Sequence, residues 1–154
     1  MVAHNYSLSD NGASLVAFSS QYHHESRADK ILHRSPTLCW FTSIYEDFPQ
    51  YIIVDMGKLV NLSRIGIYSH GMNNQNAKEI YFQFVKELPA EEHFNDPSYF
   101  GPEVERHQLE HRAGDFIWDL EQPIEARYAR LCIVDNYGGS GAFITKMYLF
   151  GEEA

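Results

Sequence analysis

Hydrophobic and polar residues alternate along much of the chain, which is the period-two pattern of half-buried β-strands. In residues 50–56 (QYIIVDM) the alternation places Ile52, Val54 and Met56 on one face. The pattern recurs in other short segments, which we predict to be strands: 13–18, 64–69, 79–85, 116–120, 128–134 and 145–150. Successive side chains of a strand point to opposite faces, so each predicted strand presents one face to a core.

The segments between these strands carry turn-forming residues, and helical patterns are scarce. Turn-forming clusters fall at 11–12 (NG), 57–58 (GK), 71–76 (GMNNQN) and 138–141 (GGSG). Only 26–32 (SRADKIL) predicts a helix, of about two turns, with Ala28, Ile31 and Leu32 toward the core. Many short strands separated by turns predict an all-β fold. We therefore expect a single domain over 1–154, an antiparallel β-sandwich or jelly roll of about eight strands.

One segment, 89–114, does not fit the strand pattern. It is acidic, rich in His and Pro, and long for a connection between strands. We therefore predict a long loop. Long connections in compact domains are usually functional or mobile.

Composition narrows the classes of partner. Hydrophobic residues make up 44% of the chain, enough for a folded core, and the formal net charge of −9 disfavours nucleic acid. Charges interrupt every apolar run, which predicts no membrane span. The polar N-terminus has no signal-peptide pattern, and this predicts an intact intracellular start and a cytoplasmic protein. Cys39 and Cys132 have apolar neighbours and are predicted to be free thiols.

Several motifs occur in an order that is more specific than any of them alone. Trp40 precedes a strand ending in VDMG (54–57), and ARYARL (126–131) precedes the final strand. Over residues 13–151 the chain resembles the discoidin family, also called the coagulation-factor type C domain, of the galactose-binding-like sandwiches. The resemblance implies a jelly roll and a binding module rather than an enzyme. The segments 32–37, 48–50 and 78–82 look most similar to intracellular members found in cilia and centrosomes.

The chain departs from the secreted members of that family in two places. Those members usually join their ends by a disulfide, whereas Cys39 follows the predicted helix and Cys132 lies in a late strand. Many sugar-binding members hold calcium at an Asp-Gly-x-x-x-Thr turn before the Trp, but residues 33–38 read HRSPTL. The first departure agrees with a reducing compartment. The second predicts binding that is independent of calcium, with no metal and no cofactor.

Three predicted loops carry more aromatic, amide and imidazole groups than turns require. Aromatic rings can stack on a sugar or peptide, and amides both donate and accept hydrogen bonds. If the family topology holds, the first two loops should lie near each other at one end of the sandwich. All three could equally be ordinary turns. The candidate ligand-binding residues are Tyr22, His23 and His24 in the first loop, His70, Asn73, Asn74 and Asn76 in the second, and Asn136 and Tyr137 in the third.

Other constellations favour structural interpretations. His107 to His111 matches H-x-x-E-H, which on a helix could bind zinc, but its acidic loop context favours a solvated loop or adventitious metal over catalysis. Trp40 and Trp118 are expected in the core. Arg127 and Arg130 are expected to be structural, with one or both paired to carboxylates.

Two function classes remain open, because a fold does not fix a function. The first is a non-catalytic intracellular module for protein–protein interaction, in a ciliary or cytoskeletal assembly. The alternative is a lectin-like module that recognises galactose-type sugars. No Ser-His-Asp order or Gly-rich phosphate loop supports an enzyme.

Overall fold

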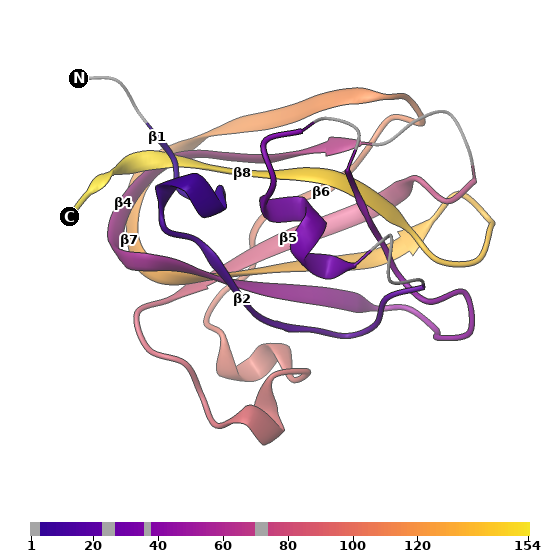
Figure 1. Ribbon diagram of the computed structural model, residues 1–154, viewed down its shortest axis with the longest axis horizontal. Coiled ribbons are helices and arrows are strands. Elements are labelled where there is room, and N and C mark those ends of the chain that lie inside the picture. The colour runs from indigo at the N-terminus through magenta and orange to yellow at the C-terminus, as the bar shows by residue number, and fades with distance from the viewer. Residues whose placement is uncertain (1–3, 23–26, 36–37, 70–73) are drawn as a thin grey trace.

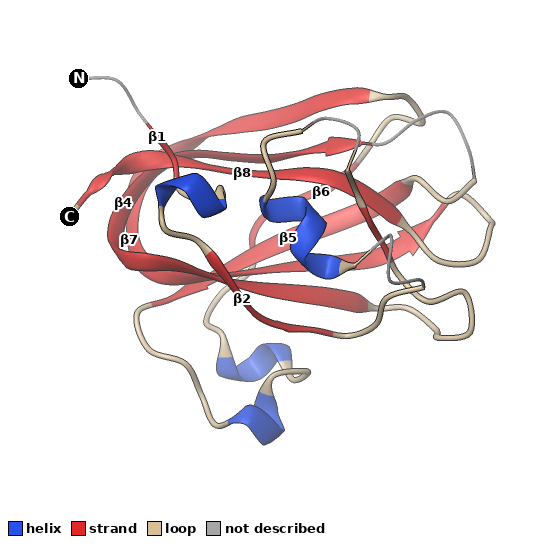
Figure 2. Cartoon of the chain, viewed as in Figure 1, coloured by secondary structure: helices blue, strands red, loops and turns tan. Residues whose placement is uncertain are grey.

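The computed structural model describes residues 4–22, 27–35, 38–69 and 74–154, and strands dominate it (Figure 2). The strands are β1 (His4–Asn5), β2 (Ser14–Phe18), β3 (Trp40–Phe41), β4 (Gln50–Ser69), β5 (Ala77–Val85), β6 (Val104–Gln108), β7 (Gly114–Asn136) and β8 (Phe143–Glu153). The described helices are short 3-10 turns: η1 (Ser9–Asn11), η3 (Ala28–Leu32), η4 (Glu91–His93) and η5 (Pro97–Tyr99). None of them is long and apolar enough to cross a membrane.

Two long strands connect the layers of an antiparallel sandwich. β4 and β7 bend near the left-hand edge of Figure 1 and contribute to both layers. In the first layer, the first half of β4 lies between β2 and the second half of β7, followed by β5 and β6. In the second layer, the other half of β4 lies between β7 and β8, while β1 and β3 pair with β8. The predicted eight-stranded sandwich is confirmed.

The core lies between the two layers and follows the predicted alternation. Ile52, Val54 and Met56 are fully buried in it, as are Trp40 and the predicted helical residues Ala28 and Ile31, with Leu32 almost so. The predicted helix forms as the 3-10 turn η3. A core Trp must satisfy its indole N–H, and Trp40 Nε1 donates to the carbonyl of Ser20 at 2.8 Å. Trp118 is only half-buried, packed against the edge of the core rather than within it.

The predicted turn at Gly57 does not end a strand. Gly57 adopts a positive φ of 86°, and the pairing of β4 with β7 shifts register between Asp55 and Val60. A glycine in this conformation allows an irregularity within a strand that continues beyond it. A Cβ at Gly57 would lie 2.7 Å from the carbonyl oxygen of Gly12, so the close approach of β4 to the N-terminal segment also requires glycine.

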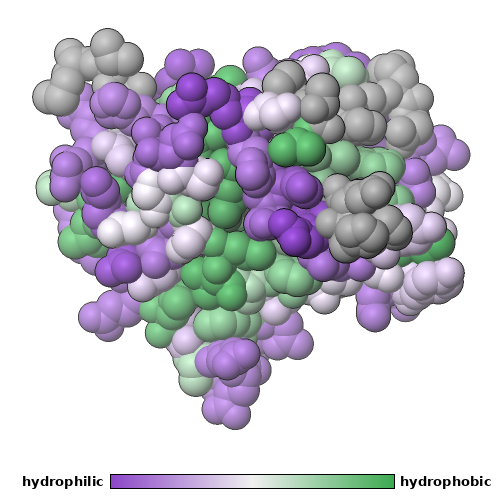
Figure 3. Space-filling view, viewed as in Figure 1, coloured by the Kyte–Doolittle hydropathy of each residue, from purple (hydrophilic) through white to green (hydrophobic). Residues whose placement is uncertain are grey.

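The surface is not uniformly polar. On the face shown in Figure 3, hydrophobic side chains gather in a band across the middle, with polar side chains on either side. Among the described residues, the large hydrophobic ones that are exposed individually are Tyr22, Tyr45, Leu59 and Tyr99.

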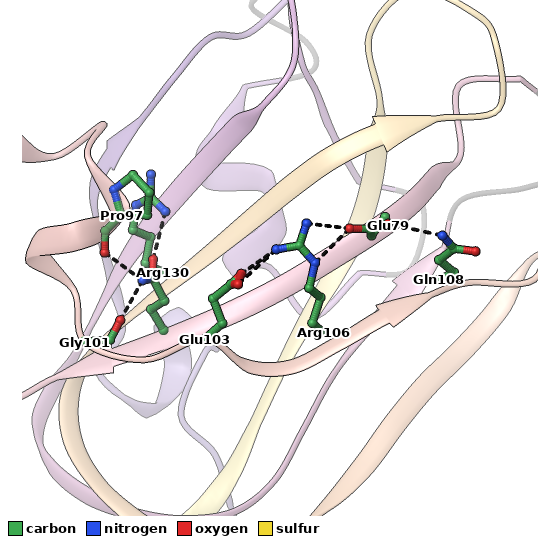
Figure 4. Close-up of polar contacts among 8 residues, drawn as sticks. Glu79, Pro97, Gly101, Glu103, Arg106, Gln108 and Arg130 are labelled. Carbon is green, nitrogen blue, oxygen red and sulfur yellow. Dashed lines mark hydrogen bonds and ion pairs between the residues drawn. The ribbon is translucent and has the colours of Figure 1, made fainter.

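The predicted loop at 89–114 is more ordered than the sequence suggested. It contains η4, η5 and β6, and β6 pairs with β5. Residues 89–103, which we name the cover segment, contact the outer face of the first layer. Buried Gln83 of β5 donates to the carbonyls of Pro97 at 2.8 Å and Gly101 at 2.9 Å (Figure 4). Phe100 is fully buried there. The loop prediction was wrong for 104–108, which form β6. Residues 89–103 do form a connection, and Gln83 holds it through backbone carbonyls, which have no sequence signature.

Candidate functional site

The described residues of the three predicted loops lie at one end of the sandwich. Residues 19–22 after β2, residues 74–76 before β5 and the β7–β8 loop lie at the right-hand end of Figure 1, and β1 and the C-terminus lie at the opposite end. Strands supply a rigid support, so loops at such an end can vary without disturbing the core. Residues 23–26 of the first loop and 70–73 of the second lie outside the described residues, so the proximity of these two loops stays a prediction.

Hydrogen bonds join the second and third loops into one unit. The Tyr137 amide donates to the Asn74 carbonyl at 3.0 Å, and the Phe143 amide donates to the Gln75 carbonyl at 2.9 Å. The Gln75 side-chain Nε2 donates to the carbonyl of Ser140 at 2.6 Å. These three hydrogen bonds fix the positions of both loops relative to each other.

A row of aromatic rings connects the first loop to this unit. The Tyr22 amide donates to the Phe41 carbonyl at 2.9 Å, and the two ring centroids are 5.1 Å apart. Phe41 stacks on Phe143 of β8 with centroids 3.9 Å apart and planes inclined by 9°. We name this assembly the loop-end surface, defined by Tyr22, Phe41, Asn74, Gln75, Tyr137 and Phe143.

The predicted site residues differ in what they can offer to a ligand. The Tyr22 side chain is 47% exposed, and Asn74 is also exposed. Asn76 is fully buried. The Asn136 side chain donates to the carbonyls of Gly139 at 2.8 Å and Gly141 at 2.7 Å, so it stabilises its own loop. His23, His24, His70 and Asn73 lie outside the described residues.

Tyr137 also has a structural position. Its hydroxyl donates to the Leu109 carbonyl, and its ring stacks on His111 with centroids 4.2 Å apart. The Lys78 ammonium lies 5.7 Å from the centroid of the same ring. These contacts attach the chain that follows β6 to the loop-end surface. Among the predicted residues that the structure describes, they leave Tyr22 and Asn74 best placed to meet a ligand.

Sequence reasoning missed two aromatic residues at this end. Phe41 joins the first and third loops through its contacts with Tyr22 and Phe143, and the sequence analysis assigned it no role. Tyr45, in the β3–β4 loop, has a side chain that is 86% exposed. Its loop adjoins the end of β2, because the Ser43 amide donates to Ser20 Oγ at 2.9 Å. An aromatic residue within a polar loop was the available signal.

The H-x-x-E-H string does not form a helical pair. His107 lies in β6, where its ring stacks on Trp118 at 4.1 Å and its Nε2 lies 2.9 Å from Glu105 Oε1. His111 stacks on a different aromatic ring, that of Tyr137. Within the described ranges, no group of three or more His, Cys, Asp or Glu side chains could hold a metal ion.

The two arginines of the ARYARL motif differ in environment. Arg127 forms a two-point pair with Asp55, with distances of 3.0 Å and 3.1 Å. Arg130 is buried and donates to Gln83 Oε1 at 3.0 Å (Figure 4). It also donates to the Phe94 carbonyl at 3.2 Å. Its guanidinium lies over the rings of Tyr51 and Phe100. One of the two therefore pairs with a carboxylate, and the other holds the cover segment.

Comparisons with known proteins agree with this fold. A family model described as F5/8 type C domain matches residues 15–146. No curated protein is a detectable sequence relative of the chain.

Several solved structures have a fold similar to that of this chain. The family 32 carbohydrate-binding module of Clostridium perfringens NanJ, in complex with galactose, is similar with a TM-score of 0.74 and 16% identity, over 97% of this chain and 98% of that one. A fucolectin from striped bass serum has a TM-score of 0.77 and 14% identity, over 100% of this chain and 50% of the lectin. Allantoicase from Saccharomyces cerevisiae has a TM-score of 0.77 and 15% identity, over 97% and 48%. At these identities the likeness shows the fold.

Proposed function

The chain belongs to the F5/8 type C domain family, and on that premise we propose that it is a non-catalytic module that binds galactose-type sugars at the loop-end surface. The observation that carries the proposal is that the described residues of three loops bring an exposed aromatic ring, that of Tyr22, and an exposed amide, that of Asn74, to one end of a rigid sandwich. Similar structures solved with galactose and with GalNAc-β-1,3-galactose support this choice of ligand.

The chemistry of the loop-end surface suits a neutral sugar. A galactose ring has an apolar patch of C–H groups that can stack on an aromatic face, and the half-exposed Tyr22 offers such a face. The amide of Asn74 can both donate and accept, as sugar hydroxyls require. This surface is built from aromatic rings and amides, so it needs no charge on the ligand.

The first test compares sugar binding by the wild type and by the Tyr22→Ala, Asn74→Ala double variant. Titration calorimetry with galactose should give binding to the wild type and a loss of about 1–3 kcal/mol in the variant, the usual effect of removing an aromatic anchor. A chelator should leave the affinity unchanged, because HRSPTL replaces the calcium turn at 33–38. A large loss with chelator would restore a calcium-dependent site.

The matched control is the Tyr99→Ala, Asn95→Ala double variant. Tyr99 has nearly the same exposure as Tyr22, at 46%, and Asn95 is exposed like Asn74. Both control residues lie in the cover segment, away from the loop-end surface. This variant should bind galactose like the wild type. Equal losses in both variants would show that the loop-end surface is not the site.

A second candidate function is protein–protein interaction in the cytoplasm, in a ciliary or cytoskeletal assembly. The apolar band in Figure 3 and the highly exposed ring of Tyr45 favour it, because aromatic residues are common anchors of protein interfaces. The free thiols of Cys39 and Cys132 are compatible with a reducing compartment. A glycan array without binding, together with a cytoskeletal protein captured by the wild type and lost in Tyr45→Ala, would favour this candidate over the lectin.

A further inference from the structure

The outer face of the second layer carries half-buried aromatic side chains on the neighbouring strands β7, β4 and β8. Gly66 and Tyr68 alternate with core residues of β4, so they lie on this outer face. In the strand register Gly66 lies opposite Tyr148 of β8, and Tyr68 lies opposite Asp115 of β7. Gly66 has no side chain to occupy the middle of the face.

The Tyr148 side chain extends across β4 to reach β7. Its hydroxyl donates to Asp115 Oδ1 at 2.6 Å, and β4 is the strand that separates the two residues. Its ring is nearly parallel to that of Phe150, with planes inclined by 10° and centroids 5.5 Å apart. Burial and the hydrogen bond to Asp115 raise the pKa of the Tyr148 hydroxyl, so it remains a donor at neutral pH. The Tyr148 ring is therefore a fixed part of the outer face.

A pocket of about 320 Å³ adjoins this ring. One part of its wall comes from the outer face, and the other comes from the chain next to η1 and η3. These two turns lie beside each other in Figure 1, and an ion pair between Arg34 and Asp10 joins them at 2.7 Å. The side chains that line the pocket include Leu8, Arg34, Tyr68, Asp115 and Tyr148.

Most polar groups of the pocket already have partners inside the protein. Asn5, which also lines it, bonds to the backbone of β8 through both its side-chain oxygen and its nitrogen, and Arg34 is paired. Lys146 lines it as well, but its Nζ is shielded from solvent and bonds to no described atom, so it offers a ligand nothing. Two groups stay available within the described part of the chain: Asp115 Oδ2, which accepts no hydrogen bond there, and the Tyr68 hydroxyl. Asp115 is exposed, so a ligand can reach its carboxylate.

We propose that this pocket binds a small uncharged phenol. The phenol hydroxyl donates to Asp115 Oδ2 and accepts from the Tyr68 hydroxyl, and the phenol ring packs against Leu8 and the Tyr148 ring. An organic anion fits poorly, because its charge would face the Asp115 carboxylate in a chain with a formal net charge of −9. A sugar also fits poorly, because two free polar groups would leave most of its hydroxyls without partners.

The first test is a titration of the isotope-labelled wild type with p-cresol, followed by amide NMR shifts. Saturable shifts should appear at Gly66, Tyr68, Asp115 and Tyr148. 4-Methylanisole keeps the ring and the oxygen but has no donor, so it should bind roughly tenfold more weakly. Equal affinities for the two compounds, or shifts confined to another surface, would overturn the proposal. This comparison needs no variant, so it does not depend on whether a substitution folds.

Three variants separate the roles of the carboxylate and the ring. Asp115→Ala should weaken p-cresol binding roughly tenfold, because it removes the acceptor. Asp119→Ala is the matched control and should bind like the wild type, since Asp119 lies on the same face of β7, is 85% exposed and pairs with Arg64. Tyr148→Phe keeps the ring and the carboxylate, so it should also bind like the wild type. Equal losses in Tyr148→Phe and Asp115→Ala would show that the carboxylate only positions Tyr148, and would overturn its role as the acceptor.

A further arm tests whether the ligand is a free molecule. N-acetyltyrosinamide carries the same phenol on a peptide-like backbone, and its two amide groups would find no free polar partners in the pocket. It should therefore bind more weakly than p-cresol. Equal or tighter binding would overturn the assignment to a small molecule in favour of a tyrosine side chain of a protein. This inference does not rest on sugar binding, and galactose should leave the affinity for p-cresol unchanged.

Discussion

At the scale of single residues, the unpaired ammonium of Lys146 should destabilise the native state. A buried donor without a partner costs about 1–3 kcal/mol, so replacing it by an apolar group of similar shape should be favourable. We expect Lys146→Met to raise the free energy of unfolding at neutral pH by about 1 kcal/mol. Urea denaturation followed by circular dichroism measures this difference.

The same variant has a predictable pH dependence. Burial lowers the pKa of Lys146 in the folded protein from its ordinary value of 10.5, so the unfolded chain binds more protons between those two values. The stability contributed by this group therefore rises with pH through that window. The advantage of Lys146→Met should shrink as the pH approaches 10.5. A constant difference, or a wild type that is the more stable form at neutral pH, would contradict the burial of an unpaired ammonium.

The two thiols should react at different rates. Burial raises the pKa of both Cys39 and Cys132, and the thiolate is the reactive form. Cys132 is buried, whereas Cys39 is half-buried. At mildly alkaline pH we expect iodoacetamide to modify Cys39 slowly and Cys132 only after unfolding, as measured by mass spectrometry. Rapid modification of Cys132 in the native protein would contradict its burial.

Individual residues also show where sequence reasoning succeeds. Trp40 and the buried residues of η3 were predicted because apolar periodicity reports on burial directly. Asn136 was predicted to meet a ligand, yet its amide stabilises its own loop. In a sequence, an amide that binds a ligand cannot be distinguished from one that stabilises its own loop. The path of the backbone decides between these two roles.

At the scale of elements, the cover segment depends on one buried amide. Gln83 Nε2 donates to two of its carbonyls, and Gln83 Oε1 accepts from Arg130. Gln83→Leu would leave these groups buried without their partner, so we expect a loss of about 2 kcal/mol in stability. Amide hydrogen exchange should become faster in the Gln83→Leu variant than in the wild type, and the increase should be larger at residues 97–101 than in the rest of the chain.

The control for this prediction is Gln108→Leu on β6. Gln108 is exposed and donates to Glu79 at 3.3 Å, so its loss should change stability little (Figure 4). If Gln83→Leu and Gln108→Leu show the same amide hydrogen exchange rates over residues 97–101, the cover segment is not held by Gln83.

Elements show a second limit of sequence prediction. Every segment predicted as a strand lies within one or close to it, because alternation is a local signal. The merging of 50–56 with 64–69 into β4, and of 116–120 with 128–134 into β7, was not predicted. Turn residues such as Gly57 look alike whether a chain reverses or only bulges, and the pairing partner decides between these outcomes.

At the scale of the whole molecule, the fold separates the loop-end surface from the core. Loops that are far apart in sequence come together because β2, β4 and β7 end, and β5 and β8 begin, at the same end of the sandwich. Sequence patterns and the family resemblance could predict the sandwich. They could not predict the Tyr22–Phe41–Phe143 contacts, because these depend on how β3 pairs with β8.

The most direct test of sugar binding is a titration of isotope-labelled protein with galactose, followed by amide NMR shifts. Binding at about millimolar affinity is sufficient for this measurement. The account predicts saturable shifts at the amides of Tyr22, Asn74, Gln75 and Ser140, with little change around Lys146 or in the cover segment. Saturable shifts confined to another surface, or none at high galactose concentration, would contradict the loop-end surface as a galactose site.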